Sequence, residues 1–537
     1  MGYKNGEEVG RYTVAGLIMK LKPSRRMNLK HSISKVLIVC FLTLSILPQH
    51  ASAKNNTPAP NFDAILGLAR EMAEKPFVDD RRPLPARLSQ LNYDQLRDIR
   101  YNPKESVWRR ERLPFQLQFF HPGGLNRDQI GYYLVDGDDV KEFPYDSDLF
   151  DYGANKLGWM DLRHLKFSGL RIHYPLNTPE YLDELAVFLG STYFRALPAG
   201  LLYGLSARAI TINCGGDNPE EFPIFKDMWV FRPGIQGNQI QVIGLFDSPS
   251  LTGVSSFVIK PGKETIMDAR VAVIARTNLA HYGFAPLTSM FWFGKNGTRR
   301  FDDYRPEVHD SDGLLMHNGK NEWLWRPLEN DGRVRMNSYE DVNPKGFGLF
   351  QRERSYIAYQ DLEANYHRRP SAWICPQGDW GKGRVQLLEL PSGTEFQDNI
   401  VVFWEPEQAL ASGSVANFAY QIRWLGEHAS LPELGRTVGM RTGSITMPRA
   451  RKFVLDYSWS TLAQDVAGGV KIEPQVTVTR GQIRPLSLSS EYSPDTRTWR
   501  IAFDVIANEN ESSVDLRALI NKNGVNATET WTYLWMP

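Results

Sequence analysis

A band between residues 281 and 406 holds the side chains best suited to chemistry. Aromatic residues stand there beside carboxylates, arginines and amides in five segments: FAPLTSMFWFG (284–294), YRPEVHDSDGL (304–314), NEWLWRPL (321–328), RRPSAWICPQGDWGKG (368–383) and QDNIVVFWEP (397–406). Proteins hold sugars with such groups, since rings stack on the apolar face of a pyranose and polar groups meet its hydroxyls. Each Trp or Asp taken alone is better explained as a core or turn residue. Together in loops, they predict a carbohydrate site.

Charge and motifs exclude several other classes of function. The 62 Lys and Arg residues nearly balance the 61 Asp and Glu residues, which gives a net charge of +1. A protein dedicated to nucleic acid carries a basic excess, so we expect no nucleic-acid partner. The sequence also lacks a GxSxG elbow, a Walker loop, a complete GxGxxG, an HExxH and a CxxC. We therefore expect no metal and no cofactor.

The N-terminal segment predicts export. The apolar run VLIVCFLTLSIL (36–47) follows Lys30 and Lys35, and Ala-Ser-Ala (51–53) comes shortly after it. A basic start, a short apolar core and a small-residue cleavage pattern, in this order, are typical of a secretory signal peptide. An uncleaved membrane anchor is the less favoured alternative, because the run is short for a bilayer span. We expect a mature protein that is soluble and exported.

The start of the chain needs a separate interpretation. Residues 1–26 are largely polar, whereas a signal peptide would normally begin close to its basic segment. We therefore take Met27 as the expected translation start and 1–26 as an upstream extension, with 1–53 removed from the mature protein. Of the cysteines beyond that point, Cys214 and Cys375 could pair in an oxidising compartment, but two cysteines alone define no disulfide framework.

Two helices are predicted in an otherwise β-rich chain. Over 62–72 the apolar residues recur at helical spacing. Over 178–189 a Thr-Pro start, a stripe of Leu182, Leu185, Phe188 and Leu189, and a stop at Gly190 also favour a helix. Elsewhere apolar and polar residues alternate with a period of two. Examples are 239–247, 264–277, 384–391 and 399–406. Turn residues separate these runs at short intervals, which predicts an all-β fold.

A change in composition and in hydrophobic periodicity near residue 407 predicts a domain boundary. The segment EQALASGSVAN (407–417) has small residues and no sustained periodicity, as a linker does. Several short alternating strands follow, including 470–480, 499–505 and 528–536. We expect a large β-sandwich over 54–408 and a smaller immunoglobulin-like β-sandwich over 409–537.

Long motif blocks identify a relationship. The blocks are YGLSARAITI (203–212), EEFPIF (220–225), APLTSMF (285–291), HDSDGL (309–314), NPKGFGL (343–349), RPSAW (369–373), WGKG (380–383) and DNIV (398–401). Through them the chain resembles the periplasmic glucan biosynthesis proteins of the OpgG and OpgD (MdoG and MdoD) family from about residue 60 to its end, and 304–314 is closer to the G branch. The resemblance implies that the exported protein lies in the periplasm. The resemblance implies a galactose-mutarotase-like sandwich followed by an immunoglobulin-like one.

The resemblance also implies a chemistry. Members are similar to glycoside hydrolases that cleave β-1,2-glucan with inversion, and the family's acid and base match Asp398 of DNIV and Asp310 of HDSDGL. Glycoside hydrolysis needs one protonated carboxyl and one carboxylate. Asp398 precedes an apolar strand, where partial burial would keep it protonated, whereas Asp310 sits in a polar loop where it can stay ionised. The other expected substrate-binding residues are Tyr366, Trp380, Lys382, Trp325, Arg326, Asp312 and His309.

Three functions are compatible with these residues. The first is an enzyme that trims the β-1,2-glucan backbone, by hydrolysis or by transfer to another sugar. The second is a non-catalytic carrier that receives the nascent glucan and presents it for branching. The third, a mutarotase that would use His309, rests on fold analogy alone. The expected partner is β-1,2-glucan, and the sequence leaves open a transient contact with the membrane glucosyltransferase.

Overall fold

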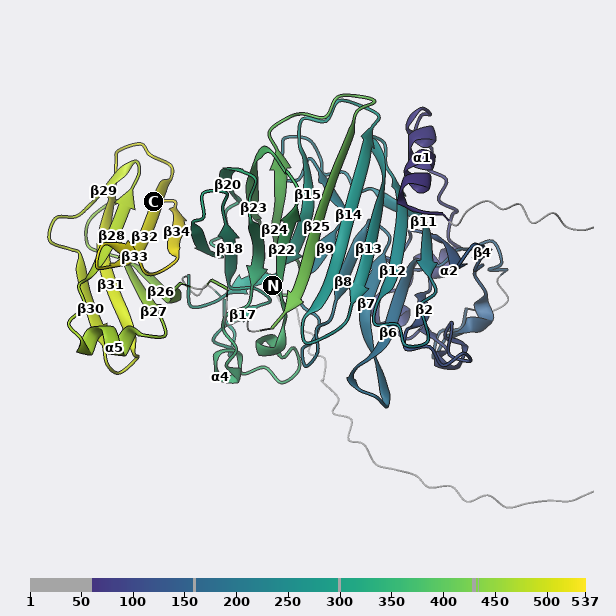
Figure 1. Cartoon of the computed structure of the whole chain (residues 1–537), viewed down its shortest axis with the longest axis horizontal. Helices are drawn as coiled ribbons and strands as arrows, with labels where there is room; N and C mark the ends of the chain where they lie inside the picture. Colours follow the sequence, from purple (N-terminus) through teal and green to yellow (C-terminus); the bar gives the residue numbers. More distant parts are fainter. Residues whose placement is uncertain (1–59, 158–160, 298–300, 427–430, 433) are drawn as a thin grey trace, which may run out of the picture. The chain divides into compact units, whose positions relative to one another are not determined.

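The computed structural model describes residues 60–157, 161–297, 301–426, 431–432 and 434–537, which belong to one compact unit (Figure 1). The expected signal peptide, the start at Met27 and cleavage before Lys54 lie outside these residues. Within the described ranges, no helix combines the length and the apolar character needed to cross a bilayer.

The fold is all-β, as the alternation predicts, and two large sheets dominate it. The ten-stranded sheet contains, in spatial order, β2 (Gln116–Phe120), β6 (Gly169–Thr178), β7 (Tyr181–Leu189), β8 (Tyr193–Ala196), β9 (Ser206–Arg208), β15 (Tyr282–Ser289), β24 (Ile400–Pro406), β23 (Lys382–Glu389) and β20 (Arg335–Val342), with β10 (Ile210–Ile212) beside β15.

The fifteen-stranded sheet runs through the whole described unit. Its order is β28 (Ile472–Val478), β32 (Val514–Lys522), β34 (Thr530–Trp535), β19 (Trp323–Pro327), β18 (Gly313–His317), β21 (Gly346–Phe350), β22 (Ser371–Gln377), β25 (Val415–Leu425), β14 (Thr265–Ala275), β13 (Leu251–Lys260), β12 (Ile240–Asp247), β11 (Ile224–Phe231), β3 (Gly131–Asp136) and β4 (Asp139–Glu142), with β33 (Val525–Asn526) beside β32.

Smaller elements complete the structure. A five-stranded sheet contains β26 (Arg436–Ser444), β27 (Ala450–Ser458), β31 (Thr498–Ala507), β29 (Gly481–Ile483) and β30 (Ser489–Ser493). Two strand pairs are β1 (Arg100–Tyr101) with β5 (Phe150–Asp151) and β16 (Phe291–Phe293) with β17 (Val308–His309). The α-helices are α1 (Phe62–Ala73), α2 (Ala86–Ser89), α3 (Tyr93–Arg97), α4 (Tyr356–Tyr359) and α5 (Leu462–Ala467), and the 3₁₀ turns are η1 (Pro103–Glu105), η2 (Ser147–Leu149) and η3 (Tyr366–Arg368).

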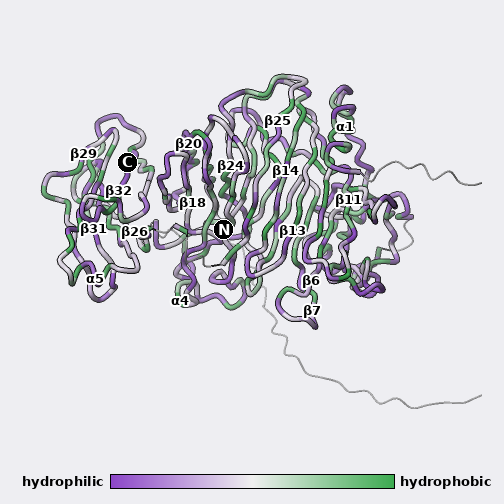
Figure 2. The backbone as a smooth tube through the Cα atoms, viewed as in Figure 1, coloured by the Kyte–Doolittle hydropathy of each residue, from purple (hydrophilic) through white to green (hydrophobic). Residues whose placement is uncertain are grey.

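The main core lies between the two large sheets. Phe188 and Phe194 of the ten-stranded sheet meet Phe257 of the fifteen-stranded sheet at ring-centroid distances of 5.5 and 4.6 Å. Hydrophobic residues concentrate along the strands of both sheets (Figure 2). Because side chains alternate between the faces of a strand, each inward residue leaves its neighbour on the outer face. The outer face of the ten-stranded sheet is therefore available to carry polar residues.

The first predicted helix is confirmed as α1. Asn61 caps it by accepting a hydrogen bond from the backbone N–H of Ala64, at 2.9 Å. Phe62, Ile65 and Ala69 are buried on the inward side of the helix. They pack against residues of β12, β13 and β14 on the outer face of the fifteen-stranded sheet.

The second predicted helix is wrong, because 181–189 forms β7. This strand pairs with β6 on one side and with β8 on the other. Four consecutive residues of this strand are buried: Leu185, Ala186, Val187 and Phe188. An unbroken apolar run of this kind fits a helix and a strand equally well, so the sequence pattern alone does not distinguish them. The strand conformation is decided by backbone hydrogen bonds to β6 and β8, which satisfy the backbone groups of β7 on both of its edges.

The segment after the expected domain boundary contributes a strand to the fifteen-stranded sheet. This strand, β25, begins at Val415 within the expected linker and lies between β14 and β22. Further along the chain, β34 pairs with β19 in parallel, so early and late strands share this sheet. The division into domains at 408 stays a prediction. Cys214 and Cys375 are both free.

Candidate functional site

Asp310 and Asp398 come from distant segments that a single backbone stretch brings together. The backbone N–H of Asp310 donates to the carbonyl of Met290, at 2.8 Å. The side chain of Asn399, next to Asp398, accepts from the N–H of Phe291 at 2.8 Å and donates to its carbonyl at 3.0 Å. Since Met290 and Phe291 are consecutive, the loop after β17 and the start of β24 are fixed to the same point.

Both carboxyl groups have raised pKa values. Asp398 is accessible to solvent but crowded by protein, and this desolvation, together with the charge of Asp310, raises its pKa to about 6. Burial also raises the pKa of Asp310, which is 8% exposed. The sequence had suggested a polar loop for Asp310, and the structure corrects this. Two coupled carboxyls share one proton more readily than they carry two charges.

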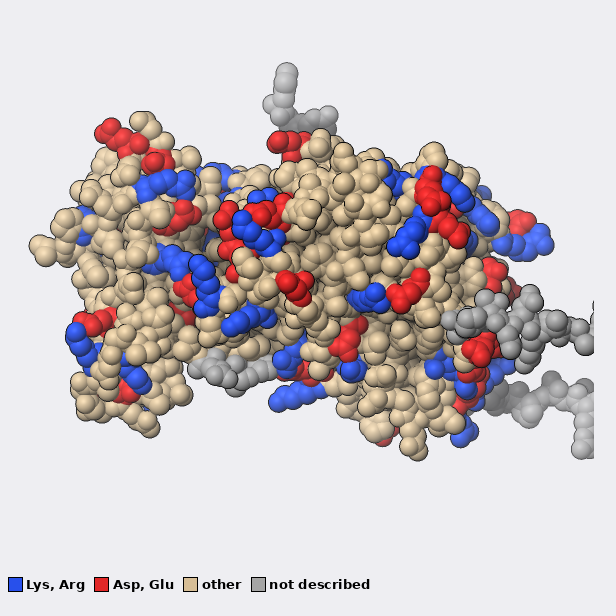
Figure 3. Space-filling view, turned by 45° about the horizontal axis from the view of Figure 1, so that its top comes forward, with Lys and Arg blue, Asp and Glu red and all other residues tan. Residues whose placement is uncertain are grey.

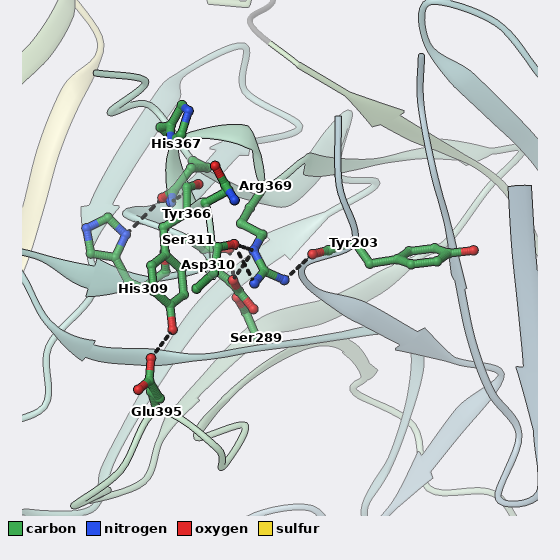
Figure 4. Close-up of polar contacts among 12 residues, drawn as sticks. Tyr203, Ser289, His309, Asp310, Ser311, Tyr366, His367, Arg369 and Glu395 are labelled. Atoms are coloured by element: carbon green, nitrogen blue, oxygen red, sulfur yellow. Dashed lines mark hydrogen bonds and ion pairs between the residues drawn. The ribbon is translucent and has the colours of Figure 1, made fainter. Parts of the chain in front are cut away.

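The surroundings decide which carboxyl keeps the proton. Arg369 Nε lies 3.5 Å from Asp310 Oδ1, and the guanidinium of Arg369 is held by the backbone carbonyls of Ala364 and Tyr203 (Figure 4). Among the described residues, Asp398 forms no ion pair and no hydrogen bond through its side chain. A fixed positive charge therefore favours the carboxylate at Asp310 and leaves the proton on Asp398.

A cavity of about 350 Å³ opens beside Asp310. Tyr366 lines it, and its hydroxyl donates to Glu395 (Figure 4). Arg305 holds Glu395 in a two-point contact at 2.8 and 3.0 Å and also binds Asp361, at 2.8 Å. This network fixes the carboxylate and the hydroxyl that face the cavity, and so preorganises a polar wall.

Two arginines on the outer face of the ten-stranded sheet complete the charge pattern. Arg195 of β8 and Arg208 of β9 both lower the pKa of Asp398, partly offsetting its burial and the effect of Asp310. Sequence analysis missed Arg195, Glu395 and Arg369 and gave Arg208 no role. Arg208 and Arg369 do lie in quoted blocks (203–212 and 369–373), which is the signal that could have found them.

His309 and Asp312 lie behind Asp310 rather than in the cavity. His309 is fully buried; it contacts Gln351 at 2.9 Å, Glu307 at 3.2 Å and Asp312 at 3.6 Å. Burial disfavours the imidazolium, but the two carboxylates outweigh this and raise the pKa of His309. Asp312 Oδ2 also accepts the backbone N–H groups of Arg352 and Glu353. These two predicted substrate-binding residues therefore anchor the loop that carries Asp310.

The same cluster has the spacing of a metal site. Potential ligand atoms of Glu307, His309 and Asp312 lie within 4.8 Å of one another. The carboxylates of Glu307 and Asp312 favour the charged imidazolium and raise the pKa of His309, so we assign the cluster to an ion-pair network. The expectation that the protein needs no metal stays a prediction.

Four predicted substrate-binding residues lie elsewhere. Trp380 is 4% exposed, packs among Phe347, Trp404, Phe418 and Tyr420, and does not line the cavity beside Asp310. Trp325 is buried under the guanidinium of Arg352, and Arg326 is buried against Glu389. Lys382 is exposed and pairs with Glu407 at 2.7 Å. These four residues were chosen because their types suit sugar binding. The sequence does not show which way each side chain points in the fold.

Fold and site together define an all-β sandwich protein with a coupled pair of carboxyl groups beside a polar cavity. The family model for "Periplasmic glucan biosynthesis protein, MdoG" matches residues 61–535, and the chain belongs to that family. This confirms the resemblance to the G branch and assigns the chain to periplasmic glucan biosynthesis. The family name implies the periplasm.

Relatives named "Glucans biosynthesis protein G" support the same assignment. The relative from Vibrio cholerae is 42% identical over 476 residues, which cover 88% of this chain and 86% of the relative. The relative from Bradyrhizobium diazoefficiens is 41% identical over 499 residues, which cover 92% of this chain and 97% of the relative. The relative from Shewanella frigidimarina is 42% identical over 485 residues, with coverages of 88% and 85%.

Proposed function

We propose that the protein trims the β-1,2-glucan backbone of periplasmic glucans by an inverting acid/base mechanism. The observation that carries the proposal is the coupled pair itself. Asp398 is accessible and has a pKa of about 6, while Asp310 is buried beside a fixed guanidinium. A protonated carboxyl that substrate can reach, next to a carboxylate held ionised, is the combination that glycoside hydrolysis requires.

Each group then has one role in the reaction. Asp398 donates its proton to the glycosidic oxygen as the bond to the anomeric carbon breaks. Asp310 takes a proton from the attacking water, whose oxygen bonds to the opposite face of that carbon. Arg369 stabilises Asp310 as a carboxylate until the proton arrives, and the next substrate finds the pair restored after proton exchange with solvent.

The path of the second proton depends on the separation of the two carboxyls. Inverting enzymes that use one water between them need roughly 6.5–9.5 Å, and we expect this spacing or more. Beyond it, a water and a substrate hydroxyl relay the proton to Asp310. Tyr366 and Glu395, hydrogen-bonded to each other on the cavity wall, are positioned to hold such a water.

The carrier function is the second candidate. The arginine-rich outer face and the cavities beside it suit glucan binding without cleavage, and only the coupled pair favours an enzyme. The mutarotase interpretation loses its support, because His309 is fully buried and its ring nitrogens are occupied by Gln351, Glu307 and Asp312. A transient contact with the membrane glucosyltransferase stays a prediction. On the face shown in Figure 3, acidic and basic side chains are intermixed.

Product analysis separates the two candidates. Purified protein is incubated with linear β-1,2-glucan, and the products are separated by size while NMR follows the new anomeric signals. We expect shorter glucans that first appear as the α-anomer. Binding without any cleavage would favour the carrier, and β-anomeric products would contradict the inverting mechanism.

A further inference from the structure

Glu529 is a buried carboxylate near the C-terminal end of the chain that no step of the proposed reaction uses. It comes directly before β34, and it is 0% exposed. Its two oxygens accept hydrogen bonds from the two terminal nitrogens of Arg352, at 2.7 and 2.8 Å, and one of them also accepts the backbone N–H of Thr437, at 2.9 Å. A buried ion pair adds little to stability compared with apolar residues of the same volume. The geometry that the pair fixes is therefore its more informative property.

The side chain of Arg352 connects three strands that are distant in the sequence. Its guanidinium lies 3.4 Å from the ring centroid of Trp325, which belongs to β19. Its Nη1 also donates to the backbone carbonyl of Thr437 in β26, at 3.2 Å. Arg352 itself lies two residues beyond the end of β21. The ion pair with Glu529 therefore fixes the end of β21 against strands from the last part of the chain.

The backbone around Arg352 holds the loop that carries Asp310. The Oδ2 atom of Asp312 accepts the backbone N–H of Arg352 and, at 2.7 Å, that of Glu353. In return, the N–H of Asp312 donates to the carbonyl of Phe350, at 2.7 Å. Because Asp312 lies two residues from Asp310, a displacement of segment 350–353 would also move Asp310.

Gln351, in the middle of this segment, connects the loop of Asp310 to Tyr366. Its Nε2 donates to the backbone carbonyl of His309 at 2.8 Å and to that of Tyr366 at 3.2 Å. Gln351 is 2% exposed, and its own backbone N–H donates to Ser371 Oγ at 3.0 Å. The carbonyl of His309 immediately precedes Asp310, and Tyr366 lines the cavity beside it. One buried amide thus sets the spacing of two polar groups of the site.

We propose that Glu529 is a positioning residue for the acid pair: through Arg352 it holds segment 350–353, and with it Asp310 and Tyr366, in the geometry that the reaction needs. The inference rests on the proposed function and extends it to residues close to the C-terminal end of the chain. Glu529 contacts neither the substrate nor the reacting atoms. Its effect passes through the arginine and the backbone hydrogen bonds of the segment.

The first test is the kinetics of Glu529→Gln. This substitution keeps the shape of the side chain but replaces the two-point charged contact with Arg352 by a neutral amide. Because a misplacement of about 1 Å can lower a rate by about 100-fold, we expect kcat on linear β-1,2-glucan to fall by about ten- to 100-fold. KM should stay within about two-fold, since the loss of an interaction needed only in the transition state lowers kcat and kcat/KM equally.

The matched control is Asp456→Asn. Asp456 is also a buried carboxylate of the C-terminal strands and is also paired with arginines, Arg441 and Arg500, but these partners form no contact with the loop of Asp310 among the contacts of the described residues. Both variants are assayed below their melting temperatures. The control should lose stability and keep its kcat, whereas Glu529→Gln should lose kcat.

The pKa of Asp398 gives a readout that a purely structural role of Glu529 would not change. The charge of Asp310 contributes to this pKa, which is about 6. A displacement of Asp310 should therefore shift the value that NMR measures for Asp398 in Glu529→Gln, and Asp456→Asn should leave it unchanged. If the wild-type protein cleaves nothing, the proposed function fails. A shift confined to Glu529→Gln would still support the positioning role.

A double variant guards against misfolding, because Glu529→Gln leaves the Arg352 guanidinium buried without a charged partner. Arg352→Met combined with Glu529→Gln removes both charges and keeps the backbone N–H groups that bind Asp312. We expect this protein to fold and to keep the low kcat. A normal kcat in the double variant, or equal effects of Glu529→Gln and Asp456→Asn on kcat and on the pKa of Asp398, would overturn the proposal.

Discussion

The pKa of Asp456 in the C-terminal part of the chain and the pKa values of the site pair Asp310 and Asp398 are shifted in opposite directions. Asp456 in β27 is 4% exposed and accepts hydrogen bonds from Arg500 at 2.7 and 2.9 Å and from Arg441 at 2.8 Å. Burial raises its pKa, but these bonds outweigh burial and the pKa falls below the usual value. Around Asp310 and Asp398 the balance is reversed, and both pKa values rise.

The opposite pKa shifts distinguish a carboxylate that stabilises the fold from a carboxyl group that can donate a proton. A buried carboxylate with all its oxygens matched to arginines stabilises the fold and holds no proton to donate. An accessible carboxyl that lacks such partners keeps its proton to a higher pH than an ordinary aspartate does, which an acid catalyst needs and which stability does not explain. Substitutions at the two kinds of position should therefore have opposite consequences for activity and for stability.

The largest expected effect is on cleavage. Asp398→Asn cannot donate a proton and Asp310→Asn cannot accept one, so each should lower kcat on β-1,2-glucan on the order of 10²–10⁴-fold. Asp456→Asn should leave kcat unchanged when assayed below its melting temperature. Initial rates with one long substrate measure all three. Near-normal rates in both site variants would remove the two aspartates from the mechanism.

The pH dependence should be the next largest effect. Because cleavage needs Asp398 protonated, kcat should fall by about ten-fold per pH unit above the pKa of about 6. Below it, the rate should level off and then decline as Asp310 takes up a proton. A rate that rises from pH 6 to 8 would contradict the assignment of Asp398 as the acid.

Stability should change in opposite directions. Asp456→Asn should lower the free energy of unfolding by about 1–2 kcal/mol at pH 7, a value reduced for the partial exposure of Arg441 and Arg500. The pKa of Asp456 is lowered by folding. Its contribution is therefore present above the unfolded pKa and is lost as pH falls through the folded one. Urea titrations at pH 7 and pH 3 measure the loss, which should shrink at the lower pH.

The smallest effect is a gain at Asp398. Its pKa is raised by folding, so the ionised form opposes folding at pH 7, and this penalty disappears as pH falls from about 6 towards the unfolded pKa. Asp398→Asn should therefore stabilise the protein at pH 7 by up to ~1 kcal/mol, after allowance for solvent exposure. The gain should vanish near pH 4. Destabilisation at pH 7 would show that the carboxylate has a structural partner.

The sequence predicted some of the fold and part of the site. Alternating strands and the α1 stripe are local signals, and both are confirmed. The motif blocks contain Asp310 and Asp398, and Tyr366 lies beside one of the blocks; the structure brings these three residues to one region. The short segment QGDWGKG (377–383) gives no sign of whether the ring of Trp380 faces solvent or, as here, lies in the core and donates its N–H to the carbonyl of Ala419.

The remaining features depend on pairings between distant segments. Arg195 and Arg208 reach the acid pair only because β8 and β9 lie between β7 and β15. The segment that begins β25 looks like a linker in the sequence, yet β25 lies in a sheet built largely from earlier residues. No local pattern encodes either arrangement, since strand order is set by the whole core.

The coupling between the two carboxyls is the most direct test of the account. The pKa of Asp398 can be followed by NMR of the side-chain carboxyl in the wild-type protein and in the Asp310→Asn variant. We predict a value of about 6 in the wild type and a lower value in the variant, because the charge of Asp310 contributes to the shift. An ordinary wild-type pKa near 3.8, or a value that Asp310→Asn leaves unchanged, would contradict the coupled pair on which the proposed mechanism rests.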